Sequence, residues 1–159
     1  MSESKYKTMR HIETVRNFID CVIRELLSRQ EQHDQSKLQQ PEVDVFEIYT
    51  AKLRDCIYAS DEYKKYMEEM KPAIDHHHTC NRHHPEYFVD SIRGMDLVDL
   101  IEMLCDWKSA TMRHNTGDIY KSLELNQKRF GYSDDIKRLL KNTVDWLEQQ
   151  NVFHHAEES

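Results

Sequence analysis

The stretch Gln32-His33-Asp34-Gln35-Ser36-Lys37, followed by Pro41-Glu42, separates two segments of helical periodicity. His33 and Asp34 offer a neutral nitrogen donor and an anionic oxygen donor on adjacent residues. That pairing suits a borderline divalent metal such as zinc, manganese or ferrous iron. Lys37, three residues after Asp34, would place a cation about one helical turn from such a metal, and a phosphate oxygen could lie between them. A His-Asp dipeptide is common by chance, so the prediction depends on ligand-type residues elsewhere in the chain.

The composition indicates one polar, helix-rich domain. A chain of 159 residues can bury a sizeable single core. Only three Gly and three Pro are present, so long uninterrupted helices are expected. The formal net charge of -7 argues against a protein that mainly grips phosphate backbones, and nucleic acid is therefore not an expected partner.

The same chain lacks the signals of membrane or secreted proteins. No apolar run has the length of a membrane span, and the N-terminal Met-Ser-Glu-Ser-Lys is too polar for a signal peptide. The cysteines form no Cys-x-x-Cys pair, which is typical of reduced thiols; they are Cys21, Cys56, Cys80 and Cys105. We therefore expect a cytoplasmic protein without a membrane partner.

Helical periodicity covers nearly the whole chain. Tyr6 to about Gln30 repeats apolar residues at helical spacing, and Met95–His114 is apolar almost all round, which predicts a central, buried helix. Ser60 and Ser133, each followed by acidic residues, are expected to cap further helices. The sequence predicts a single all-α domain over residues 1–159, with about six to seven helices and a frayed tail at 153–159.

The predicted helix Met95–His114 carries acidic residues among its apolar ones. Asp99 and Asp106 lie along one stripe of this helix. A buried carboxylate is costly unless it is paired or metal-bound. Each is therefore a candidate metal ligand, and the alternative is an ion pair with Lys108, Arg113 or a neighbouring histidine.

Five of the ten histidines crowd into the stretch His76–His84. On a continuous helix His77, Asn81 and His84 would share one face, where two imidazoles could bind a metal, or one could bind metal while the other meets a substrate. The alternative is a solvated polyhistidine run at a loop tip. The ordered spacing and the His-His-Pro-Glu-Tyr ending favour the functional interpretation.

Several motifs resemble those of known families. His-Asp-x-Ser-Lys, Asn-Arg-His-His-Pro-Glu-Tyr, Asp-Leu-Ile-Glu-Met-Leu-Cys-Asp-Trp-Lys and Asn-Gln-Lys-Arg-Phe-Gly resemble a family of bacterial and phage proteins known only as a domain of unknown function. That resemblance covers nearly the whole chain and implies no activity. His-Asp-x-x-Lys with the following Pro-Glu resembles, more distantly, the HD superfamily of metal-dependent phosphohydrolases, especially its HD-GYP branch.

The HD resemblance implies an HD-like helical bundle around one or two divalent transition metals (Mn, Fe, Co, Ni or Zn). It implies four core metal ligands: His11, His33, Asp34 and Asp106. Asp99 is the alternative to Asp106 as the final aspartate. His77 and His84 would be the two additional histidines of two-metal members. The Gly-Tyr-Pro element of the HD-GYP branch is absent, so cyclic di-guanylate is not the expected substrate.

The function expected from the resemblance is hydrolysis of a phosphate ester, with a nucleotide or related small molecule as partner. Lys37 and Arg82 would neutralise charge on the phosphoryl group, and Glu86 or His83 would handle protons. A rival hypothesis is a non-catalytic, metal-stabilised helical binding module, linked to phage or host interactions. A third is a helical interaction protein whose polar residues are satisfied internally.

Overall fold

The computed structural model describes residues 2–55, 60–112 and 117–150. Within these residues the protein has six α-helices and three short 3-10 helices, and no strand, which confirms the all-α prediction. The chain divides into two compact units, Met1–Asn81 and Arg82–Ser159, and each is described by itself. No helix of the described ranges is both long and apolar enough to cross a membrane. The tail predicted to fray, 153–159, lies outside the described residues.

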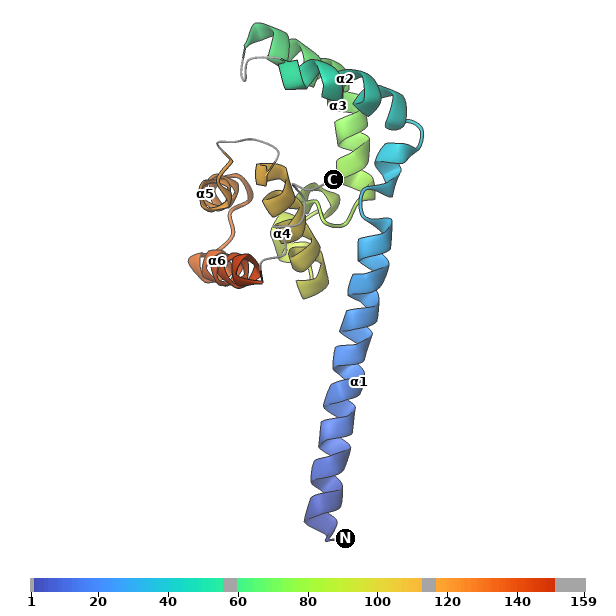
Figure 1. Cartoon of the computed structure of the whole chain (residues 1–159), viewed down its shortest axis with the longest axis vertical. Helices are drawn as coiled ribbons and strands as arrows, with labels where there is room; N and C mark the ends of the chain where they lie inside the picture. Colours follow the sequence, from blue (N-terminus) through green and yellow to red (C-terminus); the bar gives the residue numbers. More distant parts are fainter. Residues whose placement is uncertain (1, 56–59, 113–116, 151–159) are drawn as a thin grey trace. The chain divides into compact units, whose positions relative to one another are not determined.

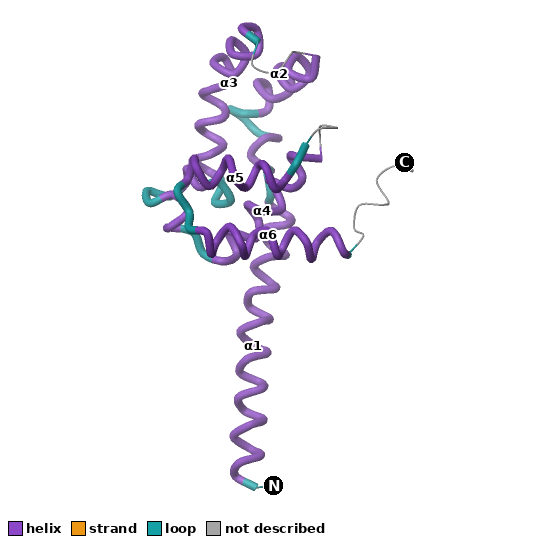
Figure 2. The backbone as a smooth tube through the Cα atoms, turned by 90° about the vertical axis from the view of Figure 1, so that its left-hand side faces the viewer, coloured by secondary structure: helices purple, strands orange, loops and turns teal. Residues whose placement is uncertain are grey.

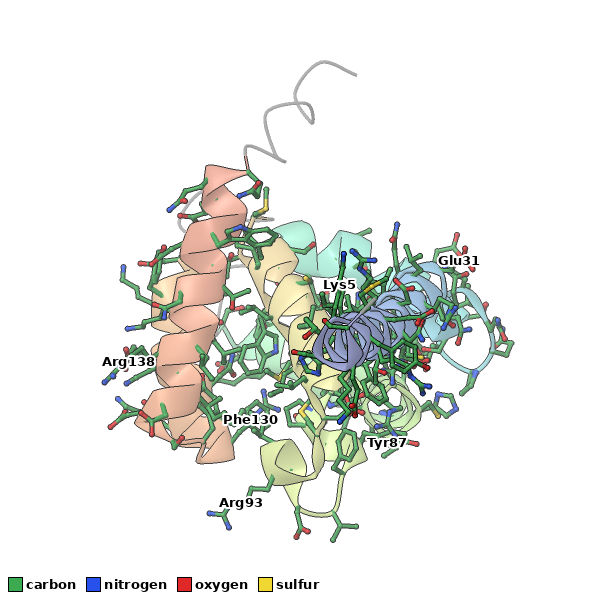
Figure 3. All side chains as sticks on the ribbon, turned by 90° about the horizontal axis from the view of Figure 1, so that it is seen from below. Lys5, Glu31, Tyr87, Arg93, Phe130 and Arg138 are labelled. Carbon is green, nitrogen blue, oxygen red and sulfur yellow. The ribbon has the colours of Figure 1, made fainter. Side chains whose placement is uncertain are left out.

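The first unit begins with the long helix α1, Glu3–Gln32 (Figure 1). It starts three residues before the predicted helix because the Ser2 side chain caps it, accepting a hydrogen bond from the Lys5 amide. Its 30 residues correspond to a length of about 45 Å. None of them is buried. Figure 3 looks nearly along this helix, with Lys5 and Glu31 labelled near its two ends.

The His-Asp stretch ends α1 and leads into a short 3-10 helix. His33 is the C-cap, and Asp34 has a left-handed backbone (φ 57°), a conformation that aspartate tolerates better than most residues. The 3-10 helix η1 (Gln35–Leu38) and a turn through Glu42 then lead into α2, Val43–Asp55. The stretch is therefore both a helix end and the start of a short second helix.

Helix α3 (Asp61–Cys80) lies against α2 (Figures 1 and 2). Ser60 caps it as predicted, accepting from the Tyr63 amide at 3.1 Å, and Pro72 lies within the continuous helix. Because α3 ends at Cys80, Asn81 is its C-cap and His84 lies beyond it. The prediction that His77, Asn81 and His84 share one helical face is therefore wrong.

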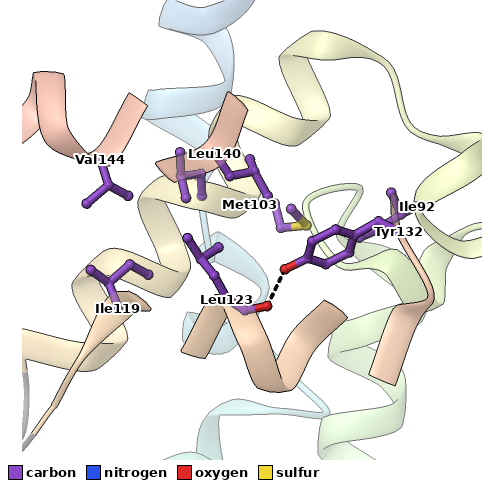
Figure 4. Close-up of a cluster of buried hydrophobic side chains, with 8 residues drawn as sticks. Ile92, Met103, Ile119, Leu123, Tyr132, Leu140 and Val144 are labelled. Atoms are coloured by element: carbon purple, nitrogen blue, oxygen red, sulfur yellow. Dashed lines mark hydrogen bonds between the residues drawn. The ribbon is translucent and has the colours of Figure 1, made fainter. Parts of the chain in front are cut away.

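The second unit packs α4 (Leu97–Met112), α5 (Ile119–Phe130) and α6 (Asp134–Gln149) around one core, after the 3-10 helices η2 (Pro85–Tyr87) and η3 (Ser91–Gly94). Ser133 caps α6 as predicted. Figure 4 shows the core, in which Tyr132 donates its hydroxyl to the Leu123 carbonyl at 2.6 Å. The buried members are Ile92, Met103, Leu104, Ile119, Leu123, Tyr132, Leu140 and Val144.

Helix α4 differs from its prediction in burial. Met103 and Leu104 are buried, whereas Leu97 and Ile101 are exposed. The apolar residues all round the helix predicted complete burial, but in this unit α4 packs on α5 along one side. The last predicted residues of this helix, 113 and 114, lie outside the described ranges.

Candidate metal centre

Asp34 is the centre of a group of ligand-type side chains in the first unit. Its Oδ1 lies 3.1 Å from the Nε2 of His77, and its Oδ2 lies 3.7 Å from the Nε2 of His33. The left-handed backbone at Asp34 turns its carboxylate toward both rings. The two histidines come from the end of α1 and the last turn of α3. The His-Asp pair and one histidine of the His76–His84 run therefore meet within this unit.

These separations match donors that share one ion. Two donors bound at about 2.1 Å lie about 3.0 Å apart in an octahedral site and about 3.4 Å apart in a tetrahedral site. The two distances at Asp34, 3.1 and 3.7 Å, bracket the tetrahedral value. The two distances reach different oxygens of Asp34, so Asp34 could share an ion with either ring. Its pair with His77 offers one oxygen donor and one nitrogen donor, and its pair with His33 offers the same donor types.

A buried carboxylate fixes the orientation of His77. The Nδ1 of His77 lies 2.9 Å from the Oε2 of Glu42, and both side chains are buried. An ionised carboxylate only accepts hydrogen bonds, so the Glu42 contact favours a hydrogen on Nδ1. The same nitrogen lies 3.0 Å from the Ser36 hydroxyl oxygen and 3.1 Å from the Asn81 amide nitrogen. With the hydrogen on Nδ1, Nε2 presents a lone pair toward Asp34. A carboxylate behind the far nitrogen of an imidazole is the usual support of a metal-binding histidine.

Glu42 is itself held by several donors. Ser36 donates its hydroxyl to the Glu42 Oε2 at 3.0 Å, and His76 Nδ1 lies 2.7 Å from Oε1. The amide of Asn81 donates to the Ser36 hydroxyl at 2.9 Å and to the His77 carbonyl. These bonds offset the cost of a carboxylate with no exposed surface.

Sequence reasoning assigned no role to Glu42 or Ser36. Both lie in the His-Asp stretch or directly after it, and the signal that could have found Glu42 is the Pro41-Glu42 step next to the His-Asp pair. Their partners are 35 and 41 positions further along the chain, so local periodicity could not link them to His77.

Lys37 contacts Asp34 directly. Its ammonium group is 2.6 Å from the Asp34 Oδ2 and 5.5 Å from the centre of the Phe46 ring. Phe46 also packs edge-on against the His77 ring, so it contacts both polar groups from the apolar side. The first unit therefore presents two imidazoles, one carboxylate and one ammonium group together.

His11 does not belong to this cluster. It is an exposed residue of α1, and α1 is continuous from Glu3 to Gln32. The 22 residue steps from His11 to His33 correspond to about 33 Å along the helix axis. His11 and His33 of one chain are therefore too far apart to bind the same ion. The prediction of His11 as a core ligand is wrong for that reason.

Arg82 and Asp99 form a bidentate ion pair in the second unit. Arg82 Nε and Nη2 donate to the two carboxylate oxygens of Asp99 at 3.0 and 2.8 Å. Asp99 is fully buried and also accepts from the Asp96 amide. The Arg82 guanidinium lies over the rings of Tyr87 and Phe88. Asp99 is therefore held in an ion pair, with Arg82 in place of the predicted partners, and Asp106 stays a predicted ligand.

The second unit repeats the carboxylate-imidazole arrangement. His83 is buried and its Nδ1 lies 3.1 Å from the Oε1 of Glu102, which orients Nε2 away from Glu102. The neighbouring His84 ring has its centre 4.2 Å from that of His83, and both rings offer a nitrogen within 4.8 Å of each other. Asp106 follows Glu102 by one turn on the same side of α4.

Glu86, a predicted proton carrier, accepts a charge-assisted bond at 2.6 Å from Arg129 on α5. This contact engages one carboxylate oxygen of Glu86 with a side chain of the same unit. Glu86 and His83 both remain predicted proton carriers.

The family of unknown function DUF5662 has a family model that matches residues 1–151. The chain belongs to DUF5662. Because the match includes both units, every candidate residue lies within the DUF5662 region. No curated protein and no solved structure matches the chain. The DUF5662 match gives no support for a relation to the HD superfamily.

Proposed function

We propose that this DUF5662 protein is a metal-dependent phosphohydrolase that acts on a nucleotide or a related small phosphate ester. The observation that carries the proposal is the position of His77 between Glu42 and Asp34. Glu42 fixes the tautomer and direction of the ring, and Asp34 supplies an anionic oxygen where the ring nitrogen points. A site built on these two donors leaves positions for water and substrate, as catalytic sites do and closed structural sites do not.

A bound divalent metal would polarise a phosphoryl oxygen and lower the pKa of a bound water toward neutrality. The residues of the chain supply the rest. Asp34 and His77 hold the donor set in place, and Lys37 places a positive charge next to Asp34, where it would offset charge on a phosphate. His83, which Glu102 orients within the second unit, remains a predicted proton carrier.

The further ligands that the sequence predicted, His84 and Asp106, remain predictions. So does the number of ions, one or two, and their identity among Mn, Fe, Co, Ni and Zn. Each predicted ligand is tested by the metal content of the matching variant, His84→Ala or Asp106→Asn, because loss of a ligand lowers the metal retained on dialysis.

The function is tested by loading the purified protein with each metal in turn and assaying phosphate monoesters and diesters. We expect turnover with at least one first-row metal, lost in Asp34→Asn and lowered in Lys37→Met. Lys71→Met is the matched control, because Lys71 pairs with an aspartate on the exposed side of α3. If the protein binds metal but turns over none of these esters, the proposed phosphohydrolase activity is wrong.

The second candidate is a non-catalytic, metal-stabilised binding module, one that contacts a phage or host protein. In this candidate the 2.6 Å contact between Lys37 and Asp34 is a structural ion pair, and Lys37 meets no phosphate. In that case metal raises the melting temperature, as any ligand of the folded state does, and Lys37→Met changes no reaction rate.

A further inference from the structure

The apolar face of α1 is the largest feature of the first unit that the candidate metal centre does not use. No residue of α1 is buried. Single exposed apolar residues are common on protein surfaces, but a contiguous apolar stripe marks an interaction surface. The exposed members are Tyr6, Met9, Ile12, Val15, Phe18, Ile19, Val22, Ile23 and Leu27.

The centre of this face has the spacing of a coiled-coil seam. Five residues alternate three and four positions apart, and these are the a and d positions of two heptads. The seam consists of Ile12, Val15, Ile19, Val22 and Leu26. Met9, Phe18 and Ile23 flank it and widen the apolar stripe. Most helical stability in proteins comes from packing of such a face, so a helix this long gains stability when the seam is covered.

We propose that α1 pairs with α1 of a second copy of this chain as an antiparallel two-helix coiled coil. The distribution of charge along α1 supports a second copy of the chain as the partner and an antiparallel orientation of the two helices. The half from residue 3 to 16 has four basic and two acidic residues, net +2, and the half from 17 to 32 has two basic and three acidic residues, net -1. An antiparallel pair places each basic half beside an acidic half, whereas a parallel pair places like halves together.

The residues that flank the seam also favour the antiparallel orientation. With Val15 facing Ile19 of the second copy, the antiparallel register sets His11 beside Glu25 and brings the two Phe18 rings together. A parallel register instead sets His11 beside Arg16. The antiparallel pair thus gains an imidazole–carboxylate contact and an aromatic contact at its midpoint.

The partner is tested by light scattering on the full chain over a range of concentrations. We expect a dimer whose dissociation constant rises about 30-fold or more in Ile19→Glu and in Val22→Glu, with helicity retained in circular dichroism. Leu125→Glu, an exposed apolar residue of α5, is the matched control and should leave the dimer unchanged. A wild-type monomer at all concentrations, or a dimer insensitive to both α1 variants, would overturn the proposal.

The direction is tested by disulfide formation in a background with all four cysteines replaced by serine. Phe18→Cys should crosslink two copies, because residue 18 meets its own counterpart at the antiparallel midpoint. Val15→Cys should not, since it faces residue 19. Crosslinking through residue 15 but not through residue 18 would show a parallel pair and reject the antiparallel one.

Discussion

The Nδ1 of His77 lies 2.9 Å from the Oε2 of Glu42, a carboxylate with no exposed surface. This contact fixes which ring nitrogen carries the hydrogen and therefore which one presents a lone pair toward Asp34. The candidate metal centre thus depends on a residue that binds no metal itself. Glu42 is a positioning residue, and its contribution can be measured separately from that of the ligands.

Glu42→Gln should weaken metal binding about 10- to 100-fold, because an amide can present either its oxygen or its NH2 group to Nδ1 and no longer fixes the tautomer. The measurement is competition between the protein and a chelator of known affinity. Glu69→Gln is the matched control, since Glu69 is an exposed residue of α3 that bonds only Tyr49 among the described side-chain hydrogen bonds. Equal weakening in both variants, or in neither, would contradict a positioning role.

Asp99→Asn should lower the free energy of unfolding by about 2–3 kcal/mol, because it leaves the Arg82 guanidinium without its charged partner. The loss is smaller than for a fully buried pair since the Arg82 side chain is 39% exposed. Urea unfolding followed by circular dichroism measures it. Asp90→Asn, on the exposed turn before η3, should change stability little. If Asp99→Asn left the free energy of unfolding unchanged, the Arg82–Asp99 ion pair would not stabilise the fold.

Tyr132 should make the second unit sensitive to alkaline pH. Burial, with a smaller effect of the Glu124 charge, raises the pKa of Tyr132 from its ordinary value near 10 to about 12. A folded-state pKa above the unfolded one means that the stabilisation is complete below pH 10 and is lost as the pH rises toward 12. Tyr132→Phe should remove this part of the pH dependence and, by removing the bond to the Leu123 carbonyl, cost about 1 kcal/mol at neutral pH. If the free energy of unfolding changed with pH in the same way for wild type and Tyr132→Phe over this pH range, Tyr132 would not be the group responsible.

The parts of the fold that local chemistry decides could be predicted from the sequence. Ser60 and Ser133 cap the helices that follow them because a serine hydroxyl before acidic residues satisfies the first amides of a helix. The all-α class follows in the same way from helical periodicity and the shortage of glycine and proline. The left-handed turn at Asp34 was not predicted, because aspartate adopts that conformation only where the surrounding contacts hold it.

The candidate site was predictable only in part. His33, Asp34 and Lys37 are adjacent in sequence, so their proximity could be expected. The contact of His77 with Glu42 joins residues 35 positions apart, and nothing local distinguishes His77 from His76 or His78 as the buried member. The prediction of His11 as a ligand was wrong because the helix that carries it is continuous, and the length of that helix separates His11 from His33.

The proposed function depends first on the binding of a divalent transition metal by Asp34 and His77. Elemental analysis of the purified protein after extensive dialysis tests this binding, for wild type, Asp34→Asn and the control Asp75→Asn, an exposed residue of α3. We predict about one or two first-row metal ions per wild-type and Asp75→Asn chain, and most of that metal lost in Asp34→Asn. Wild-type protein that holds no metal after incubation with Mn, Fe, Co, Ni or Zn, or an Asp34→Asn variant that retains it all, would contradict metal binding at this site.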